Sequence, residues 1–167
     1  PPVEFLLDGW LQRGLAGALV AEGGTGKTVL MMQLALCGAL GRPFLGLPMG
    51  RAGTFVLLSL DDSKEDLDGA FADMLNAEKL TPDEEEAART RVRLISLRGL
   101  EQAPVFSMPT AQGVERTYVE YQIAEKLRGI PELRCVMLDT LRMFSGGNSN
   151  DERVITCATQ ALISLSD

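Results

Sequence analysis

The sequence predicts an α/β domain built on a mainly parallel sheet. Three compact runs, at 54–60, 92–97 and 135–138, are rich in Val, Leu and Ile and lack polar alternation, as is typical of strands covered on both faces. Segments with helical periodicity lie between these runs, and a glycine-rich turn links a further apolar run to a long apolar segment. At 167 residues, the chain has the size of a single domain, so we expect one domain over 1–167.

The chain begins this alternation with a strand, a turn and a helix. Residues 17–21 are a short apolar run that we expect to be the first strand, and residues 27–40, apolar on nearly every face, predict a buried helix. Three later helices are predicted because apolar residues recur on one face. These residues are Leu67, Ala70, Phe71, Met74 and Leu75; Val119, Ile123 and Leu127; and Val154, Cys157, Ala158, Ala161, Leu162 and Leu165.

Two intervening segments are interpreted from their polar and breaking residues. Pro82 and the acids at 83–86 predict the first turn of a short helix with Thr81 as its cap, rather than a binding site. Residues 98–113 contain two prolines and two glycines and predict a long loop to which we assign no role.

Composition narrows the possible chemistry. The chain has no histidine, which excludes Ser-His-Asp and Cys-His nucleophile systems and His-ligated zinc. Cys37, Cys135 and Cys157 lie far apart in apolar runs and predict buried thiols. A net charge of −7 gives no support for a surface broadly attracted to nucleic acid. The longest apolar stretch, 29–40, is too short to cross a bilayer and no signal-peptide layout is present, so we expect a cytoplasmic protein without a membrane partner.

The strongest motif is the stretch 21–28, Ala-Glu-Gly-Gly-Thr-Gly-Lys-Thr. It matches the Walker A pattern except that Ala21 stands in place of the first glycine, and it lies between an apolar run and a helix as that pattern requires. Its glycines let the backbone fold closely around phosphates, so that amide N–H groups and the helix N-terminus face the negative charge. The residues expected to bind ATP are Glu22, Gly23, Gly24, Thr25, Gly26, Lys27, Thr28 and Val29.

Lys27, Thr28 and Asp139 have expected roles in phosphate and metal chemistry. Lys27 should reach the β and γ phosphates, and Thr28 should supply a hydroxyl to Mg²⁺, which prefers oxygen ligands and retains several waters. Asp139 ends the apolar run Arg-Cys-Val-Met-Leu-Asp, the layout of a Walker B strand whose aspartate holds Mg²⁺ from the carboxyl edge of the sheet. We therefore expect Thr28 and Asp139 to share the metal ion.

Asp61 and Asp62 follow a second strand and are candidates for the general base. Asp61 is the preferred residue to polarise the attacking water, and Asp62 is the second candidate. Asp62 or Ser63 could instead cap the helix that follows, because residues 62–66 are a good helix start. A purely structural role for both acids stays open at this point.

Five motifs, at 2–7, 17–28, 42–46, 58–63 and 138–151, resemble those of the RecA-like P-loop ATPases of the RepA family. This family is grouped with RepA, the hexameric replicative helicase of broad-host-range plasmids. The motif at the C-terminal end, Leu-Asp-Thr-Leu-Arg-Met-Phe followed by glycines and asparagines, is the most distinctive. The likeness covers most of the chain.

This resemblance implies a three-layer α/β/α core with a mainly parallel sheet that continues beyond the strand ending at Asp139. The C-terminal part of that core, with a polar sensor residue and an arginine finger, is therefore expected to be missing from this chain. The resemblance also implies ATP hydrolysis with Mg²⁺ in a homo-hexameric ring that acts on single-stranded DNA, the isolated chain being a weak ATPase. The acid at the place of Asp61 is usually glutamate in the family, so Asp61 reaches one methylene less far.

Residues beyond the Walker B strand have open interpretations. Arg142, in the family's motif with Phe144, is expected either to contact phosphate or a neighbouring subunit, or to pair with Asp151. Asn148 and Asn150 are expected to cap the helix beginning near Asp151 rather than to act as ligands.

Several functions compete with an ATP-driven helicase. A non-helicase RecA-like ATPase used in regulation or recombination is the main alternative, and a module that binds nucleotide without hydrolysing it is another. A small-molecule kinase is disfavoured because no arginine-rich lid segment occurs, and a GTPase because no Asn-Lys-x-Asp motif occurs.

Overall fold

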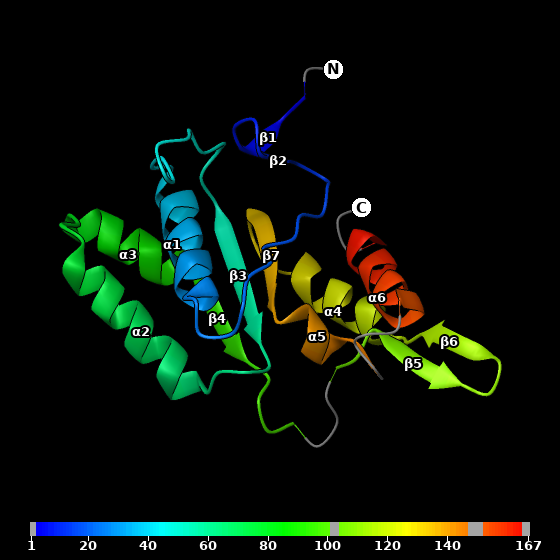
Figure 1. The fold of residues 1–167 in the computed structure, drawn as a ribbon. Coiled ribbons are helices and arrows are strands. Elements are labelled where there is room, and N and C mark those ends of the chain that lie inside the picture. Colours follow the sequence, from blue (N-terminus) through cyan, green and yellow to red (C-terminus); the bar gives the residue numbers. More distant parts are fainter. Residues whose placement is uncertain (1–2, 101–103, 147–151, 165–167) are drawn as a thin grey trace.

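The fold is mixed α/β, with a parallel sheet at its centre and helices on both sides (Figure 1). The structure is a computed structural model that describes residues 3–100, 104–146 and 152–164. Two small antiparallel hairpins lie apart from the central sheet. This architecture agrees with the predicted fold class and is consistent with a P-loop NTPase-like fold.

Three strands form the central sheet. β3 (Thr54–Ser59) is the middle strand and pairs in parallel with β4 (Val92–Ser96) and with β7 (Leu133–Asp139). Each strand lies within two residues of a predicted run, so the predicted strands and their parallel direction are confirmed. The register aligns Ser59 with both Ser96 and Asp139, which places the polar ends of all three strands at one edge.

Each side of the sheet has its own apolar core, because alternate residues of β3 face opposite sides. Phe55 and Leu57 belong to one cluster, whereas Val56 and Leu58 belong to the other. The helices of the first side are α1 (Lys27–Leu40), α2 (Lys64–Ala77) and α3 (Pro82–Arg91), and those of the second are α4 (Val119–Arg128), α5 (Leu141–Phe144) and α6 (Glu152–Ser164).

The prediction that all strands are covered on both faces is right for β3 and wrong for β4. Every residue of β3 is buried, but Arg93 and Ile95 of β4 are exposed. These two residues align with Val56 and Leu58, which face the side of the sheet where α4 and α6 pack. On that side the helices cover β3 and β7 but leave β4 uncovered. β4 is therefore an edge strand with one covered face.

α1 begins and ends at glycines and lies unusually close to the sheet. Gly26 and Gly41 flank it at the predicted bounds 27–40, and both have left-handed backbone, which at Gly41 is the common end of an α-helix. A Cβ added to Gly38 would stand 1.9 Å from Cζ of Phe55, so only glycine admits this approach. Gly38 therefore lets α1 pack directly against β3.

The acidic run at 83–86 starts α3, as predicted. The hydroxyl of Thr81 accepts the N–H of Glu84 at 3.3 Å, and Oε2 of Glu84 accepts the N–H of Thr81 at 2.9 Å, which is a capping box. Arg42, just after α1, donates to Oε1 of Glu84 at 2.7 Å. The backbone hydrogen bond from Thr81, followed by the contacts of Arg42, lowers the pKa of Glu84.

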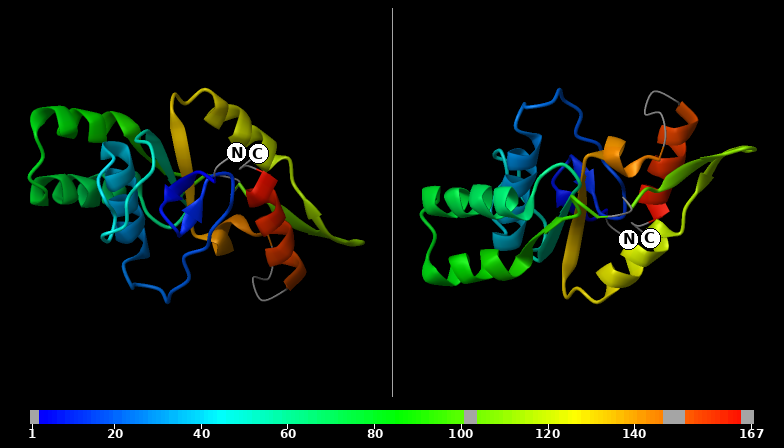
Figure 2. Two further views of the ribbon diagram at one scale, coloured as in Figure 1. Left: turned by 90° about the horizontal axis from the view of Figure 1, so that it is seen from above. Right: turned by 90° about the horizontal axis from the view of Figure 1, so that it is seen from below.

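The predicted long loop at 98–113 is wrong in its second half. β5 (Ser107–Thr110) and β6 (Gly113–Arg116) pair as an antiparallel hairpin, which projects from the body of the molecule (Figure 2). Pro109 favours a loop in the sequence, but a two-stranded hairpin has an outer edge at which a missing N–H is tolerated. β1 (Phe5–Leu7) and β2 (Leu11–Gln12) form the second hairpin, which the sequence did not reveal.

The predicted first strand at 17–21 is also wrong. No strand of the described chain contains these residues, and they lie on the surface, with Val20 89% exposed. Only Leu19 and Val20 carry large apolar side chains in this run, so little apolar area is available to offset the entropy of ordering a strand. The segment that leads into the glycine turn therefore runs outside the sheet.

The three cysteines are free thiols, but Cys37, Cys135 and Cys157 are each only partly buried. The expectation of fully buried thiols is thus too strong.

Candidate functional site

The glycine turn before α1 has the backbone shape that its sequence predicts. Gly24 and Gly26 have φ angles of 75° and 84°, in the left-handed region that side chains other than glycine rarely adopt. A Cβ added to either residue would meet nothing within 4 Å, so backbone conformation, and not space, requires glycine here. The turn leaves α1 with an open N-terminus, because Gly26 supplies no side-chain cap.

Lys27 folds back over the turn. Its Nζ donates to the carbonyl oxygens of Ala21 at 2.9 Å and Glu22 at 2.6 Å, and the hydroxyl of Thr25 donates to the same Glu22 oxygen at 2.8 Å. The ammonium group thus closes the turn on itself. A phosphate group placed there would offer Lys27 stronger, charge-assisted hydrogen bonds than these neutral carbonyls do.

Thr28 and Asp139 join the start of α1 to the end of β7. The Thr28 hydroxyl donates to Oδ2 of Asp139 at 2.5 Å, across 111 positions of the sequence. Asp139 is 3% exposed. Burial raises the pKa of its carboxyl group, the hydrogen bond from Thr28 opposes that rise, and the nearby carboxylates of Asp62 and Asp61 add to it. An added cation would relieve this concentration of negative charge.

Asp61 and Asp62 lie in the turn after β3, at the same edge of the sheet. Asp61 is exposed, whereas Asp62 is partly buried. Both carboxylates are close enough to raise the pKa of Asp139, and Asp62 has the larger effect. Ser63, and not Asp62, caps α2 by accepting the N–H of Asp66 at 3.1 Å.

The donor set fits a magnesium ion bound together with phosphate. Among the described residues, no group of three or more His, Cys, Asp and Glu side chains is arranged to hold a metal alone. The Thr28 hydroxyl and a carboxylate oxygen of Asp139 lie side by side, and Mg²⁺ commonly takes only one or two oxygen ligands from protein, with water and phosphate completing the shell. The remaining expected ATP-contacting residue, Val29, is 53% exposed in the first turn of α1.

Sequence reasoning missed two serines at this edge. Ser59 and Ser96 end neighbouring strands in register, and both hydroxyls contact the turn that carries the acids. The sequence does show a serine at the end of each of these two strands. That both serines lie at the candidate site follows only from the pairing of β3 with β4, which the sequence alone does not predict.

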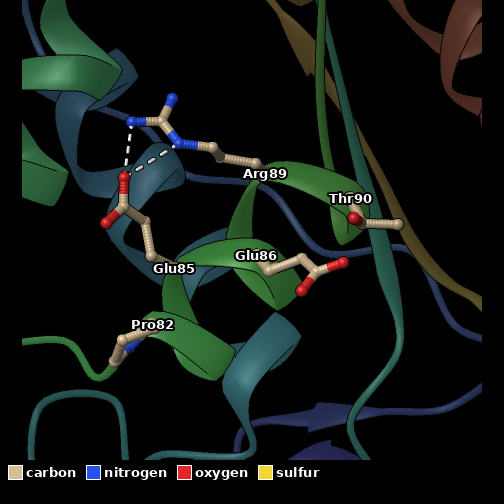
Figure 3. Close-up of a pocket in the computed structure, with 5 residues that line it drawn as sticks. All are labelled: Pro82, Glu85, Glu86, Arg89 and Thr90. Atoms are coloured by element: carbon tan, nitrogen blue, oxygen red, sulfur yellow. Dashed lines mark hydrogen bonds and ion pairs between the residues drawn. The ribbon is translucent and has the colours of Figure 1, made fainter.

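A surface hollow on α3 does not belong to this site. Its lining comes from a single helix and consists of Pro82, Glu85, Glu86, Arg89 and Thr90 (Figure 3). Arg89 donates to Glu85 at 2.8 Å, so the charge best suited to bind phosphate is already paired. We assign no ligand to this hollow.

Residues beyond β7 add little to the site. Arg142 is exposed on α5, while Phe144 is fully buried and stacks on Phe106 at a centroid distance of 5.5 Å. Asn148, Asn150 and Asp151 lie outside the described residues, and with them the predicted cap and the predicted partner of Arg142.

A family model described as an AAA domain matches residues 1–167, the whole of the chain. No protein with a curated description matches it. Within the part of the chain that the structure covers, no helix has the length and apolar character needed to cross a membrane.

Proposed function

Because the chain belongs to the AAA domain family of P-loop ATPases, we propose that it binds ATP through residues 22–29 and hydrolyses it with Mg²⁺. The observation that carries this proposal is the contact between Thr28 and Asp139 beside the glycine turn. It joins a hydroxyl at the start of a helix to a buried carboxylate at the end of a parallel strand, where α/β proteins bind phosphorylated ligands.

Nucleotide binding uses the turn and Lys27. The amide groups of Gly23, Gly24 and Gly26 and the open N-terminus of α1 face the phosphates. Lys27 leaves the carbonyls of Ala21 and Glu22 and turns toward the phosphate chain. Mg²⁺, when bound, neutralises charge on the phosphates, and Thr28 and Asp139 are the residues that hold it.

Hydrolysis requires a carboxylate near the attacking water. Asp61 or Asp62 accepts a proton from that water as its oxygen bonds to the γ phosphorus. The bond from that phosphorus to the bridging oxygen of ADP breaks in the same displacement, giving ADP and phosphate. Both acids lie beside Asp139, which supports this assignment, although each is one methylene shorter than the glutamate usual in the RepA family.

We propose that residues 1–167 form a single RecA-like, three-layer domain. The parallel central sheet with helices on both sides supports this assignment. β7 is only partly buried over most of its length, which fits a sheet that continues beyond this strand.

At the level of the assembled protein, we propose a ring of identical subunits that acts on single-stranded DNA as a RepA-type replicative helicase. Exposed Trp10 and Leu15, 78% and 58% accessible, support contact between subunits near the N-terminal hairpin. A non-helicase ATPase of regulation or recombination is the alternative. Strand separation in an unwinding assay with the full-length protein distinguishes the two.

The metal assignment is tested by measuring the Mg²⁺ dependence of ATP binding and turnover. Thr28→Ala and Asp139→Asn should each remove most of the gain in ATP affinity that Mg²⁺ gives the wild type, because each deletes one proposed ligand. Thr90→Ala, an exposed threonine on α3, is the matched control and should keep that gain. An undiminished Mg²⁺ response in both site variants would contradict the proposal.

A further inference from the structure

Ser59 is the polar residue that ends the fully buried strand β3, directly after four apolar residues. It is 0% exposed, and its hydroxyl has three partners within the turn that follows β3. The hydroxyl accepts the N–H of Asp62 at 3.0 Å and that of Asp61 at 3.3 Å, and it donates to Oδ2 of Asp62 at 3.3 Å. One donor and two acceptor lone pairs are all that a hydroxyl has, so Ser59 is fully used.

Ser96 holds the same turn from the neighbouring strand. Its hydroxyl donates to the carbonyl oxygen of Asp62 at 2.7 Å. The register of the sheet aligns Ser96 with Ser59, and Ser59 in turn aligns with Asp139 on the other side. The turn is therefore fixed to the ends of β3 and β4, at the edge of the sheet where β7 carries the proposed metal ligand.

These contacts are specific to the acid-bearing turn and are not needed to start α2. That helix is capped by Ser63, whose hydroxyl bonds to the N–H and the carboxylate of Asp66. Removing the Ser59 hydroxyl would leave two backbone N–H groups and one carboxylate oxygen of the turn without their partner.

We propose that Ser59 is a positioning residue for ATP hydrolysis, which orients the Asp61–Asp62 turn toward the metal edge, with Ser96 as its support. This inference rests on the proposed ATPase function and assigns a residue to it. Ser59 does not touch the reacting atoms; it acts through the acids. Its loss should therefore slow the chemical step and leave nucleotide binding intact.

The test compares wild type, Ser59→Ala and Ser63→Ala in calorimetric ATP binding and in single-turnover cleavage of ATP. Ser59→Ala should slow cleavage by about 10- to 100-fold, the scale of a misplaced catalytic group, with little change in the ATP dissociation constant. Ser63→Ala, which removes a serine hydroxyl four positions away that caps α2, should leave the cleavage rate near that of wild type. Ser59→Thr keeps the hydroxyl and should restore most of the rate.

A double-variant experiment separates positioning from a general loss of structure. In an Asp61→Asn/Asp62→Asn background, adding Ser59→Ala should cause no further loss of rate, because the acids through which it acts are gone. The same fold loss in both backgrounds would overturn the inference, as would a loss confined to ATP affinity. Should Ser59→Ala fail to fold, Ser96→Ala provides the same test, with a smaller expected loss of rate.

Different results would contradict the proposed ATPase function and the positioning role of Ser59. If the wild type binds no ATP, or if the Asp61→Asn/Asp62→Asn protein cleaves it as fast as wild type, the proposed function itself is wrong. If ATP is bound and cleavage depends on the acids, but Ser59→Ala and Ser96→Ala both cleave at the wild-type rate, the positioning role alone is wrong.

Discussion

The substitution Gly38→Ala tests the close packing of α1 against the sheet. This packing also places Thr28, at the start of α1, beside Asp139. A Cβ at Gly38 would lie 1.9, 2.3 and 2.7 Å from three ring carbons of Phe55, which is itself 1% exposed. Neither the ring nor the helix can move without disturbing the core. Overpacking of this kind costs about 1–3 kcal/mol, and alanine recovers roughly 1 kcal/mol of helix propensity, so Gly38→Ala should lower the free energy of unfolding by up to about 2 kcal/mol.

Gly69 provides the matched control, since it lies inside α2 and is exposed. A Cβ there would meet nothing within 4 Å. Gly69→Ala should therefore raise the free energy of unfolding by up to about 1 kcal/mol through helix propensity alone. Urea unfolding followed by circular dichroism measures both variants. If Gly38→Ala stabilises the protein as Gly69→Ala does, the close approach of α1 to Phe55 is wrong.

Two further predictions concern the capping box and a thiol. Thr81→Ala should lower the free energy of unfolding by about 1 kcal/mol, because it removes the N-cap of α3. Thr90→Ala, at the other end of that helix, should change the free energy of unfolding little. Equal effects of the two substitutions in urea titrations would contradict the capping role of Thr81. Burial raises the pKa of Cys135 to about 12 although part of the residue remains accessible, so its thiol stays protonated at pH 9. Alkylation of Cys135 by iodoacetamide at pH 9, followed by mass spectrometry, should be about 100-fold or more slower in native than in urea-unfolded protein, and equal rates would show that the thiol is not buried.

The strands and helices of the core could be predicted because their signals are local and mutually consistent. β3 and β7 contain the compact apolar runs 55–58 and 135–138, and such runs are typical of strands in a parallel sheet covered by helices. The start of α3 follows from Thr81, Pro82 and Glu84, whose spacing produces a capping box without help from the rest of the fold.

The errors arise where structure depends on partners distant in sequence. The run 17–21 has strand-like composition, but a parallel strand exists only when a neighbouring strand accepts its hydrogen bonds, and the described chain provides no such pairing for it. The hairpin of β5 and β6 was hidden by Pro109, which pairs opposite Val114 without an N–H of its own.

Part of the candidate site could likewise be anticipated. The proximity of Thr28 and Asp139 follows from a helix and a strand that end at the same edge of a parallel sheet, and it is observed. Their role in holding a metal stays a prediction. The contacts of Ser59 and Ser96 could not be anticipated, because they depend on the register between β3 and β4.

The central claim is that the turn before α1 binds ATP, and calorimetry with Lys27→Ala tests it most directly. Wild type should bind ATP in the presence of Mg²⁺ at one site per chain. Loss of the charge-assisted contacts of Lys27, worth about 1.5–3 kcal/mol, should weaken binding by about 10- to 100-fold. Lys64→Ala, which removes an exposed lysine paired with Asp68, should bind as wild type does. Undiminished ATP affinity in Lys27→Ala would contradict the assignment of this turn as the phosphate site.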